Sequence, residues 1–305
     1  MSQKRWLGAL GVWIVLAAAA VAAPPYKALI VDGQNGHNWK ETTPVLKKLL
    51  EETGLFTVDV ATSPPKGGDM SGFQPNFAAY NVVVSNYQGD PWSAETQKAL
   101  VDYVQNGGGL VIYHFACAAF PKWKEYNEMM GLGGWGGRTE KDGPYVRWRD
   151  GKIVRQTTPG PNDVRTDKTG KTTVIVGSHG PSQEFQLIVR EPNHPITKGL
   201  PPAFMHTTDE LYGWLRGPAK NLTVLATAFA PKELKGSDEH EPLLTTVTYG
   251  KGRVFFNALG HTAKELKSVA FIVTFQRGAE WAATGKVTQA VPKDFPTADK
   301  ASLRQ

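Results

Sequence analysis

The sequence predicts an α/β protein built on a doubly wound, mostly parallel sheet. Short apolar runs alternate with amphipathic stretches between residues 27 and 114, in the order strand, helix, strand, strand, helix, strand. This alternation is typical of such sheets. Three apolar runs in the chain are also followed closely by a histidine. The 305 residues are enough for one large domain or two small ones with an ample core.

The first three elements follow from hydrophobic periodicity. Residues 27–31 have the pattern of a buried strand, since four apolar residues follow Lys27 without a break. Residues 42–53 carry apolar side chains at helical spacing, and Gly54 is expected to end that helix. Residues 56–60 alternate between apolar and polar side chains, which predicts a second strand.

The next elements lead to the second histidine. Residues 81–85 form a third apolar run. Ser93 is expected to cap a helix that runs to Asn106, because its hydroxyl can accept a hydrogen bond from the first turn. Three glycines at 107–109 end that helix, and the following strand leads to His114.

The pattern changes at about residues 135–182. Residues 145–149 and 152–155 are strand-like and flank Asp150-Gly151, a strong signal for a two-residue hairpin turn. Residues 157–173 are polar and rich in turn formers. We therefore expect an inserted β-hairpin and loop here, without a separate core.

Strand-like runs resume in the second half of the chain, at residues 185–189, 222–227, 243–249 and 254–258. The turn at 249–252 predicts antiparallel pairing of the last two. Residues 264–283 are expected to form a closing helix, with Thr262 as its cap. The α/β domain is thus expected to span 24–286, and the polar residues 287–305 to form a loosely ordered tail.

The N-terminus has the pattern of a secretory signal peptide over residues 1–23. Lys4 and Arg5 precede an apolar run at 7–21, and small residues follow. The alternative is an uncleaved membrane anchor, but the run is short for a span of about 20 residues. We expect an exported protein, periplasmic or secreted, with no stable membrane span after cleavage.

Composition excludes some partners. The formal charge of +6 is scattered, without a run of five basic residues, and so nucleic acid is not an expected partner. Cys117 is the only cysteine, which excludes an intramolecular disulfide. The oligomeric state is left open by the sequence.

Three histidines are the main candidates for chemistry. His37, His114 and His261 each follow a predicted strand, and the carboxyl ends of parallel strands meet at one edge of a sheet. Imidazole titrates near neutrality and is the commonest metal ligand, so their convergence predicts proton transfer or metal binding. An ordinary turn histidine at His37 and a hydrogen-bonded core histidine at His114 are the alternatives.

Asp209 and Glu210 lie beside Tyr212. Such carboxylates could orient an imidazole, bind a cation or accept hydrogen bonds from sugar hydroxyls. A pair of helix-capping acids is the alternative. Asn35, in the glycine turn before His37, is a further candidate for substrate binding.

Other residues are candidates for contact with a sugar. Arg138 follows a glycine-rich loop that contains Trp135, and its guanidinium could contact an anion or a hydroxyl. Five aromatic rings could stack on a sugar or belong to the core: Trp135, Trp148, Trp214, Tyr145 and Tyr212. Cys117, three residues after His114, could be a nucleophile but more often such a cysteine is a small buried apolar residue.

Six ordered segments together resemble the ThuA-like family, named for a trehalose-utilisation protein. They are 31–40 (VDGQNGHNWK), 107–114 (GGGLVIYH), 194–201 (HPITKGLP), 209–212 (DELY), 249–255 (YGKGRVF) and 259–262 (LGHT). The resemblance covers about residues 26–283. It implies a flavodoxin-like fold similar to class I glutamine amidotransferases, without their Cys-His-Glu machinery. It also implies a role in sugar catabolism, often beside oxidoreductases that produce 3-keto sugars.

The expected function is an exported enzyme that processes sugars or keto-sugars. The expected catalytic residues are His37, His114, His261, Glu210 and Asp209, and the expected substrate-binding residues are Asn35, Arg138, Trp135 and Tyr212. The three histidines could also bind a divalent metal such as zinc or manganese. A non-catalytic glycan-binding or scaffold protein is the main alternative, and thiol chemistry at Cys117 is a third.

Overall fold

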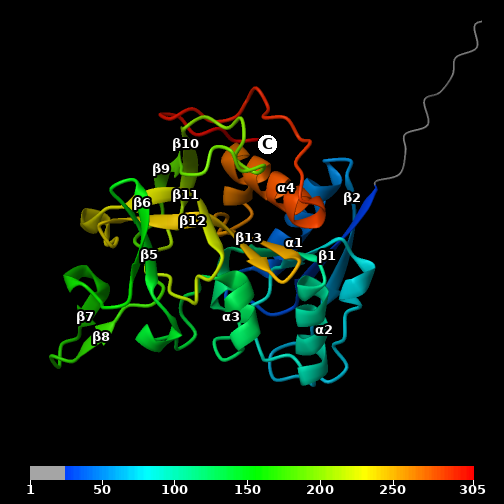
Figure 1. Cartoon of the computed structure of the whole chain (residues 1–305), viewed down its shortest axis with the longest axis horizontal. Coiled ribbons are helices and arrows are strands. Elements are labelled where there is room, and N and C mark those ends of the chain that lie inside the picture. The colour runs from blue at the N-terminus through cyan, green and yellow to red at the C-terminus, as the bar shows by residue number, and fades with distance from the viewer. Residues whose placement is uncertain (1–24) are drawn as a thin grey trace, which may run out of the picture.

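The computed structural model describes residues 25–305, and a nine-stranded mixed sheet runs through it (Figure 1). The strand order is β10-β9-β11-β12-β13-β4-β3-β1-β2. The predicted signal peptide at 1–23 lies outside the described residues. Within the described part, no helix is both long and apolar enough to cross a membrane.

One half of the sheet is parallel and contains the strands that the sequence predicts first. Its members are β1 (Tyr26–Asp32), β2 (Phe56–Thr62), β3 (Val82–Ser85), β4 (Gly109–Tyr113) and β13 (Gly252–Asn257). They pair in the order β2-β1-β3-β4-β13. The residues of β3 and β4 are all buried, because helices cover both faces of this half.

The other half is antiparallel, so the expectation of a mostly parallel sheet is wrong. It contains β9 (Gln183–Val189), β10 (Ala203–Asp209), β11 (Leu222–Ala230) and β12 (Glu239–Tyr249). The chain reverses at the glycine turn between β12 and β13, as predicted, and every strand beyond β12 then pairs antiparallel. The sequence analysis missed β10, whose alternation is interrupted by neighbouring polar residues.

Four helices pack on the sheet: α1 (Trp39–Glu51), α2 (Ala94–Gln105), α3 (Lys124–Met130) and α4 (Val269–Thr284). Figure 1 shows α4 on one side of the sheet and α2 and α3 on the other. Ser93 caps α2 as predicted, accepting a hydrogen bond from the Thr96 amide. Thr262 does not cap α4; it bonds to Glu265 in a separate 3-10 turn that precedes the helix.

The insertion forms two small antiparallel pairs beside the antiparallel half of the main sheet (Figure 1). They are β5 (Tyr145–Arg149) with β6 (Lys152–Gln156), the predicted hairpin, and β7 (Val164–Thr166) with β8 (Thr172–Val174). The fully buried Arg147 joins the insertion to the sheet, because its guanidinium pairs with Asp163 in the insertion and with Glu241 on β12.

The C-terminal segment is not loosely ordered, contrary to expectation. Residues 287–305 contain no helix or strand, yet their backbone is hydrogen-bonded to the body of the protein. The Met205 amide of β10 donates to Thr297, and the Val269 amide at the start of α4 donates to Ser302. The ring of Phe295 packs on Phe204 of β10 at 5.1 Å between centroids. These contacts hold the segment against β10 and the start of α4.

The half-buried imidazole of His194 is expected to make the free energy of unfolding depend on pH. Its Nδ1 accepts a hydrogen bond from the Ile196 amide, and burial lowers the pKa of His194 to about 4. The unfolded chain therefore binds more protons than the folded one between about pH 4 and 6.5, and stability is lost as the pH falls through this range. The free energy of unfolding should therefore fall by about 1–2 kcal/mol less in His194→Asn than in the wild type over this pH range, after allowance for solvent screening.

Urea unfolding at pH 7 and pH 4.5 measures this effect. Asparagine keeps an acceptor for the Ile196 amide and does not titrate. The wild-type free energy of unfolding should therefore fall more steeply than that of the variant. Equal pH slopes in the two proteins would contradict the assignment.

Candidate functional site

The three histidines expected to converge do so at the carboxyl ends of the parallel strands. His37 lies in the loop after β1, His114 directly follows β4, and His261 lies in the loop after β13. The ring of His37 is 5.0 Å from that of His114 and 4.5 Å from that of His261, between centroids. The predicted convergence is therefore confirmed, because these loops meet at one edge of the sheet.

His114 is held in a strained elbow between β4 and a 3-10 turn. Its φ of 43° lies in the left-handed region that residues with a side chain rarely adopt. Nδ1 lies 2.7 Å from the Ala258 carbonyl, which can only accept, and so Nδ1 carries the proton. Nε2 is then the acceptor for the Tyr212 hydroxyl at 2.8 Å. These two contacts fix the ring and its tautomer.

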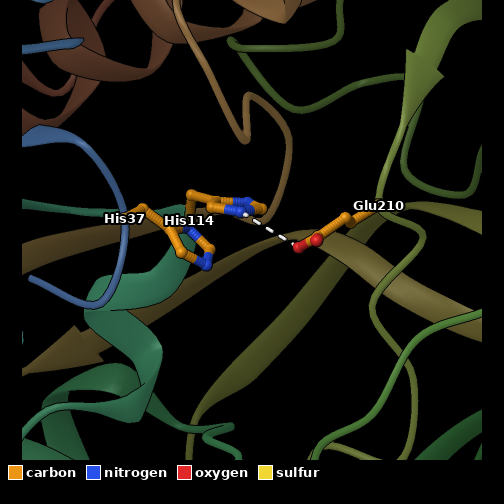
Figure 2. Close-up of side chains that lie close together, drawn as sticks. All are labelled: His37, His114 and Glu210. Carbon is orange, nitrogen blue, oxygen red and sulfur yellow. Dashed lines mark ion pairs between the residues drawn. The ribbon is translucent and has the colours of Figure 1, made fainter. Parts of the chain in front are cut away.

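Glu210 lies at the centre of the cluster, immediately after β10. One carboxylate oxygen, Oε2, is 3.7 Å from His114 Nε2, the contact drawn in Figure 2. The other oxygen, Oε1, is 3.4 Å from both His179 Nε2 and His261 Nδ1. The carboxylate thus lies between imidazoles on both sides, while only 8% of the residue is exposed.

His179 is a member of this cluster that the sequence analysis missed. It comes from the end of the insertion, where Ser178 pairs with Gly213 in an isolated bridge and aligns the segment beside Glu210. Its Nδ1 lies 2.7 Å from the Gly180 carbonyl. A β-branched run at 172–176 precedes His179, and β8 forms at its start, so position after a strand could have revealed this histidine.

The cluster perturbs the titration of its members. Burial, and after it the neighbouring imidazoles of His114 and His261, lower the pKa of His37 to about 3. Burial alone would raise the pKa of Glu210, but the surrounding imidazoles outweigh it and hold that pKa below its usual range. Glu210 is therefore an ionised carboxylate and His37 a neutral imidazole at pH 7.

One donor atom from each of His37, His114 and Glu210 lies within 4.8 Å of the others. This set differs from the expected three histidines, because Glu210 takes the place of His261. The difference arises because β10, which the sequence analysis missed, delivers the carboxylate between the loops that follow β4 and β13.

Asp209 does not face the cluster, contrary to its expected catalytic role. It is buried, and Oδ2 accepts hydrogen bonds from the Gly260 amide at 2.6 Å and from His206 Nε2 at 2.8 Å. Oδ1 accepts from the amides of Glu210 and His261. Alternation along the end of β10 points Asp209 away from Glu210, so its carboxylate holds the His261 loop rather than a substrate.

Two expected substrate-binding residues have polar groups that bond within the protein itself. Arg138 is buried, and its guanidinium donates to the carbonyls of Ala118, Ala119 and Gly134. These hydrogen bonds hold the glycine-rich loop against the elbow. They also satisfy buried carbonyls that would otherwise have no donor. Asn35 bonds to Asn86 and accepts from the His37 amide, so it shapes the turn that presents His37.

Two of the aromatic candidates line the cluster. The buried Tyr212 ring stacks on His114 at 4.4 Å, and Trp135 packs edge-on against Tyr212 at 4.6 Å. Trp148, Trp214 and Tyr145 are elsewhere, and none presents a free face to this site. Trp148 lies under Arg190, Tyr145 lies under Arg216, and the Trp214 indole donates to Asn162 within the insertion.

Cys117 is not suited to nucleophilic chemistry. The thiol is fully buried, and burial raises its pKa to about 12. Because the thiolate is the reactive form, a cysteine with such a pKa is unreactive near neutrality. The position gives no support to thiol-based amidotransfer.

Comparison with known proteins adds the family. A family model described as trehalose utilisation, ThuA, matches residues 27–282. Searching curated protein sequences finds no match to the chain.

Two solved structures extend this finding. A ThuA-like protein from Parabacteroides merdae is 48% identical, with a TM-score of 0.85, over 92% of this chain and 98% of that one. A ThuA-like protein from Bacteroides uniformis is 20% identical, with a TM-score of 0.56, over 90% of this chain and 97% of that one. The second likeness concerns the fold alone. The family match over most of the chain, together with the first structure, places this protein in the ThuA family.

Proposed function

We propose that this protein is an exported enzyme that processes sugars or keto-sugars through a histidine–carboxylate site. The observation that carries the proposal is the ionised carboxylate of Glu210, placed between imidazoles from four separate segments. The description of its family as trehalose utilisation supports a carbohydrate-related substrate. The basic and apolar pattern of residues 1–23 supports export.

The strand order supports the fold that the resemblance implies. The parallel strands β2-β1-β3-β4-β13 have the order of a flavodoxin-like sheet, in which ligands bind at the carboxyl ends near the reversal of strand order. His37 and His114 follow β1 and β4 on either side of β3. We therefore infer a flavodoxin-like parallel half, related to class I glutamine amidotransferases, with its reactive site at that edge.

The cluster is suited to proton abstraction next to a ketone. The carboxylate of Glu210 takes a proton from the carbon α to the carbonyl, and the C–H electron pair forms a C=C bond while the carbonyl oxygen becomes negative. In a 3-keto glycoside the β substituent is the anomeric oxygen. When this oxygen departs, its bond to the anomeric carbon breaks and the carbonyl re-forms as part of an enone. The proton taken up by Glu210 is transferred to the departing oxygen. Isomerisation results if the proton returns to carbon instead.

His179 and His261 are placed to complete this chemistry. Their side chains are 34% and 30% exposed, whereas that of His114 is 1% exposed, so they lie on the side of Glu210 that a substrate can reach. An imidazole there can donate a hydrogen bond to the developing oxyanion or a proton to the leaving oxygen.

The test is an assay of the purified protein with 3-keto glycosides and their parent glycosides in D₂O, followed by proton NMR. We expect deuterium at the carbon α to the ketone or loss of the glycoside, for keto sugars only. His114→Ala should abolish both changes, whereas His240→Ala, which alters a half-buried ring packed on the exposed Phe229, should retain them. Binding of the sugars without exchange or product would overturn the proposal and favour a glycan-binding protein.

A further inference from the structure

We infer that His37, His114 and Glu210 together bind one divalent transition-metal ion, of the zinc or manganese class. The inference rests on the proposed function in treating this cluster as the reactive centre, and it adds a ligand that the cluster would hold.

The donor atoms are already close to coordination spacing. Zinc ligands lie about 2.0–2.2 Å from the ion, so any two of them are at most about 4.4 Å apart. In the structure, one donor atom from each of the three residues lies within 4.8 Å of the others. Shifts of a few tenths of an ångström would bring all three onto one ion.

Two of these residues carry buried polar atoms without a partner. His37 Nδ1 and Glu210 Oε2 are both inaccessible and make no hydrogen bond among the described residues. A buried polar atom without a partner costs roughly 1–3 kcal/mol, and more when it is charged. Figure 2 shows the three side chains close together. A cation there satisfies the nitrogen and the carboxylate oxygen together.

The tautomer of His114 is also that of a metal ligand. A ligating imidazole commonly donates its other N–H to a carbonyl or carboxylate, which directs its lone pair at the ion. The Ala258 carbonyl has this role, and Nε2 of His114 is directed toward Glu210. The Tyr212 hydroxyl donates a hydrogen bond to the same nitrogen at 2.8 Å, and this hydrogen bond must break when an ion binds there.

The ligand set indicates the class of metal and of site. Two imidazoles and one carboxylate suit zinc or manganese better than calcium or magnesium, which prefer oxygen ligands. Three protein ligands leave at least one position open, as in catalytic rather than structural sites. An ion bound there would polarise a sugar carbonyl or lower the pKa of a bound water.

His261, which the sequence analysis expected to be a ligand, lies outside this set. Both His261 and His179 contact the opposite carboxylate oxygen, Oε1, at 3.4 Å. They are partly exposed, as His37 is, whereas His114 and Glu210 are buried. The assignment therefore separates an inner group that holds the ion from an outer pair that faces the substrate.

Calorimetric titration tests the assignment. The purified mature protein is treated with a chelator, dialysed and titrated with ZnCl₂ and with MnCl₂. We expect one ion per chain, bound roughly 100-fold or more weakly by Glu210→Gln and by His37→Ala. His240→Ala should bind as the wild type does. Tyr212→Phe should bind at least as tightly, because it removes the hydroxyl that competes for His114 Nε2. Circular dichroism checks that each variant is folded.

Several outcomes separate this inference from the proposed function. Binding no tighter than about 1 mM, or equal affinity in Glu210→Gln, His37→Ala and the wild type, would overturn the metal site. Turnover by the wild type together with no detectable binding of either ion would overturn the metal site and leave the proposed function standing. One bound ion lost in both ligand variants, without turnover of any keto sugar, would support the metal site and count against the proposed function.

Discussion

Replacing Glu210 with glutamine is expected to reduce turnover of a keto-sugar substrate by about 10³-fold, equivalent to about 4 kcal/mol of transition-state stabilisation. The reason is the central position of its carboxylate, which contacts His114 on one side and His179 and His261 on the other. Glutamine keeps the shape but can neither accept the substrate proton nor stabilise neighbouring positive charge. Steady-state kinetics by NMR or absorbance measures the effect.

The control for this variant is Glu184→Gln, which removes the same charge from an exposed position on β9. It should be indistinguishable from the wild type. If Glu210→Gln turned over the substrate within a few-fold of the wild-type rate while remaining folded, the carboxylate would not be the base.

Replacing Arg147 with methionine is expected to lower the free energy of unfolding by about 3–5 kcal/mol, because it leaves buried carboxylates without their cation. The guanidinium is fully buried and pairs with Asp163 at 2.9 Å and with Glu241. Burial already raises the pKa of Glu241, and removal of Arg147 would leave it less compensated. Urea unfolding monitored by tryptophan fluorescence gives the change.

Two further variants test the cause of that loss. Arg147→Met combined with Glu241→Gln should recover part of the stability, since the double variant no longer buries an unpaired charge on β12. Lys220→Met breaks an ion pair with Glu128 whose lysine is 70% exposed, and should change stability by no more than about 1 kcal/mol. A loss of that small size for Arg147→Met would contradict the explanation.

The stability of this ion pair also bears on the site. Glu241 accepts hydrogen bonds from the amide of Trp214 and from Ser237. Gly213, adjacent to Trp214, pairs with Ser178 next to His179. A weakened Arg147 network would therefore loosen the segment that presents His179.

Much of the parallel half of the sheet was predictable from the sequence, because its strands are buried on both faces. Residues 82–84 are three consecutive valines and residues 109–113 are apolar throughout, and β3 and β4 form there. The convergence of His37, His114 and His261 followed from the same reasoning, since a side chain just beyond a parallel strand must lie at the ligand-binding edge.

The antiparallel half and the finer roles in the site were less predictable. β10 has polar residues on both faces near its end, because its last residues bond to loops rather than pack in the core. Sequence adjacency made Asp209 and Glu210 look equivalent, but the strand sends their side chains in opposite directions. The role of Arg138 could not be predicted either, because no sequence pattern marks a buried arginine that donates to backbone carbonyls.

The C-terminal segment has a practical consequence for handling the protein. β10 is the last strand of the sheet, and its free side is occupied by the backbone around Thr297. Shortening the chain before this point would bare a strand edge available for self-association into aggregates. It would also withdraw support from the strand that positions Glu210. Affinity tags are therefore better kept away from the C-terminus, and C-terminal truncations for crystallisation should retain Thr297 and Ser302.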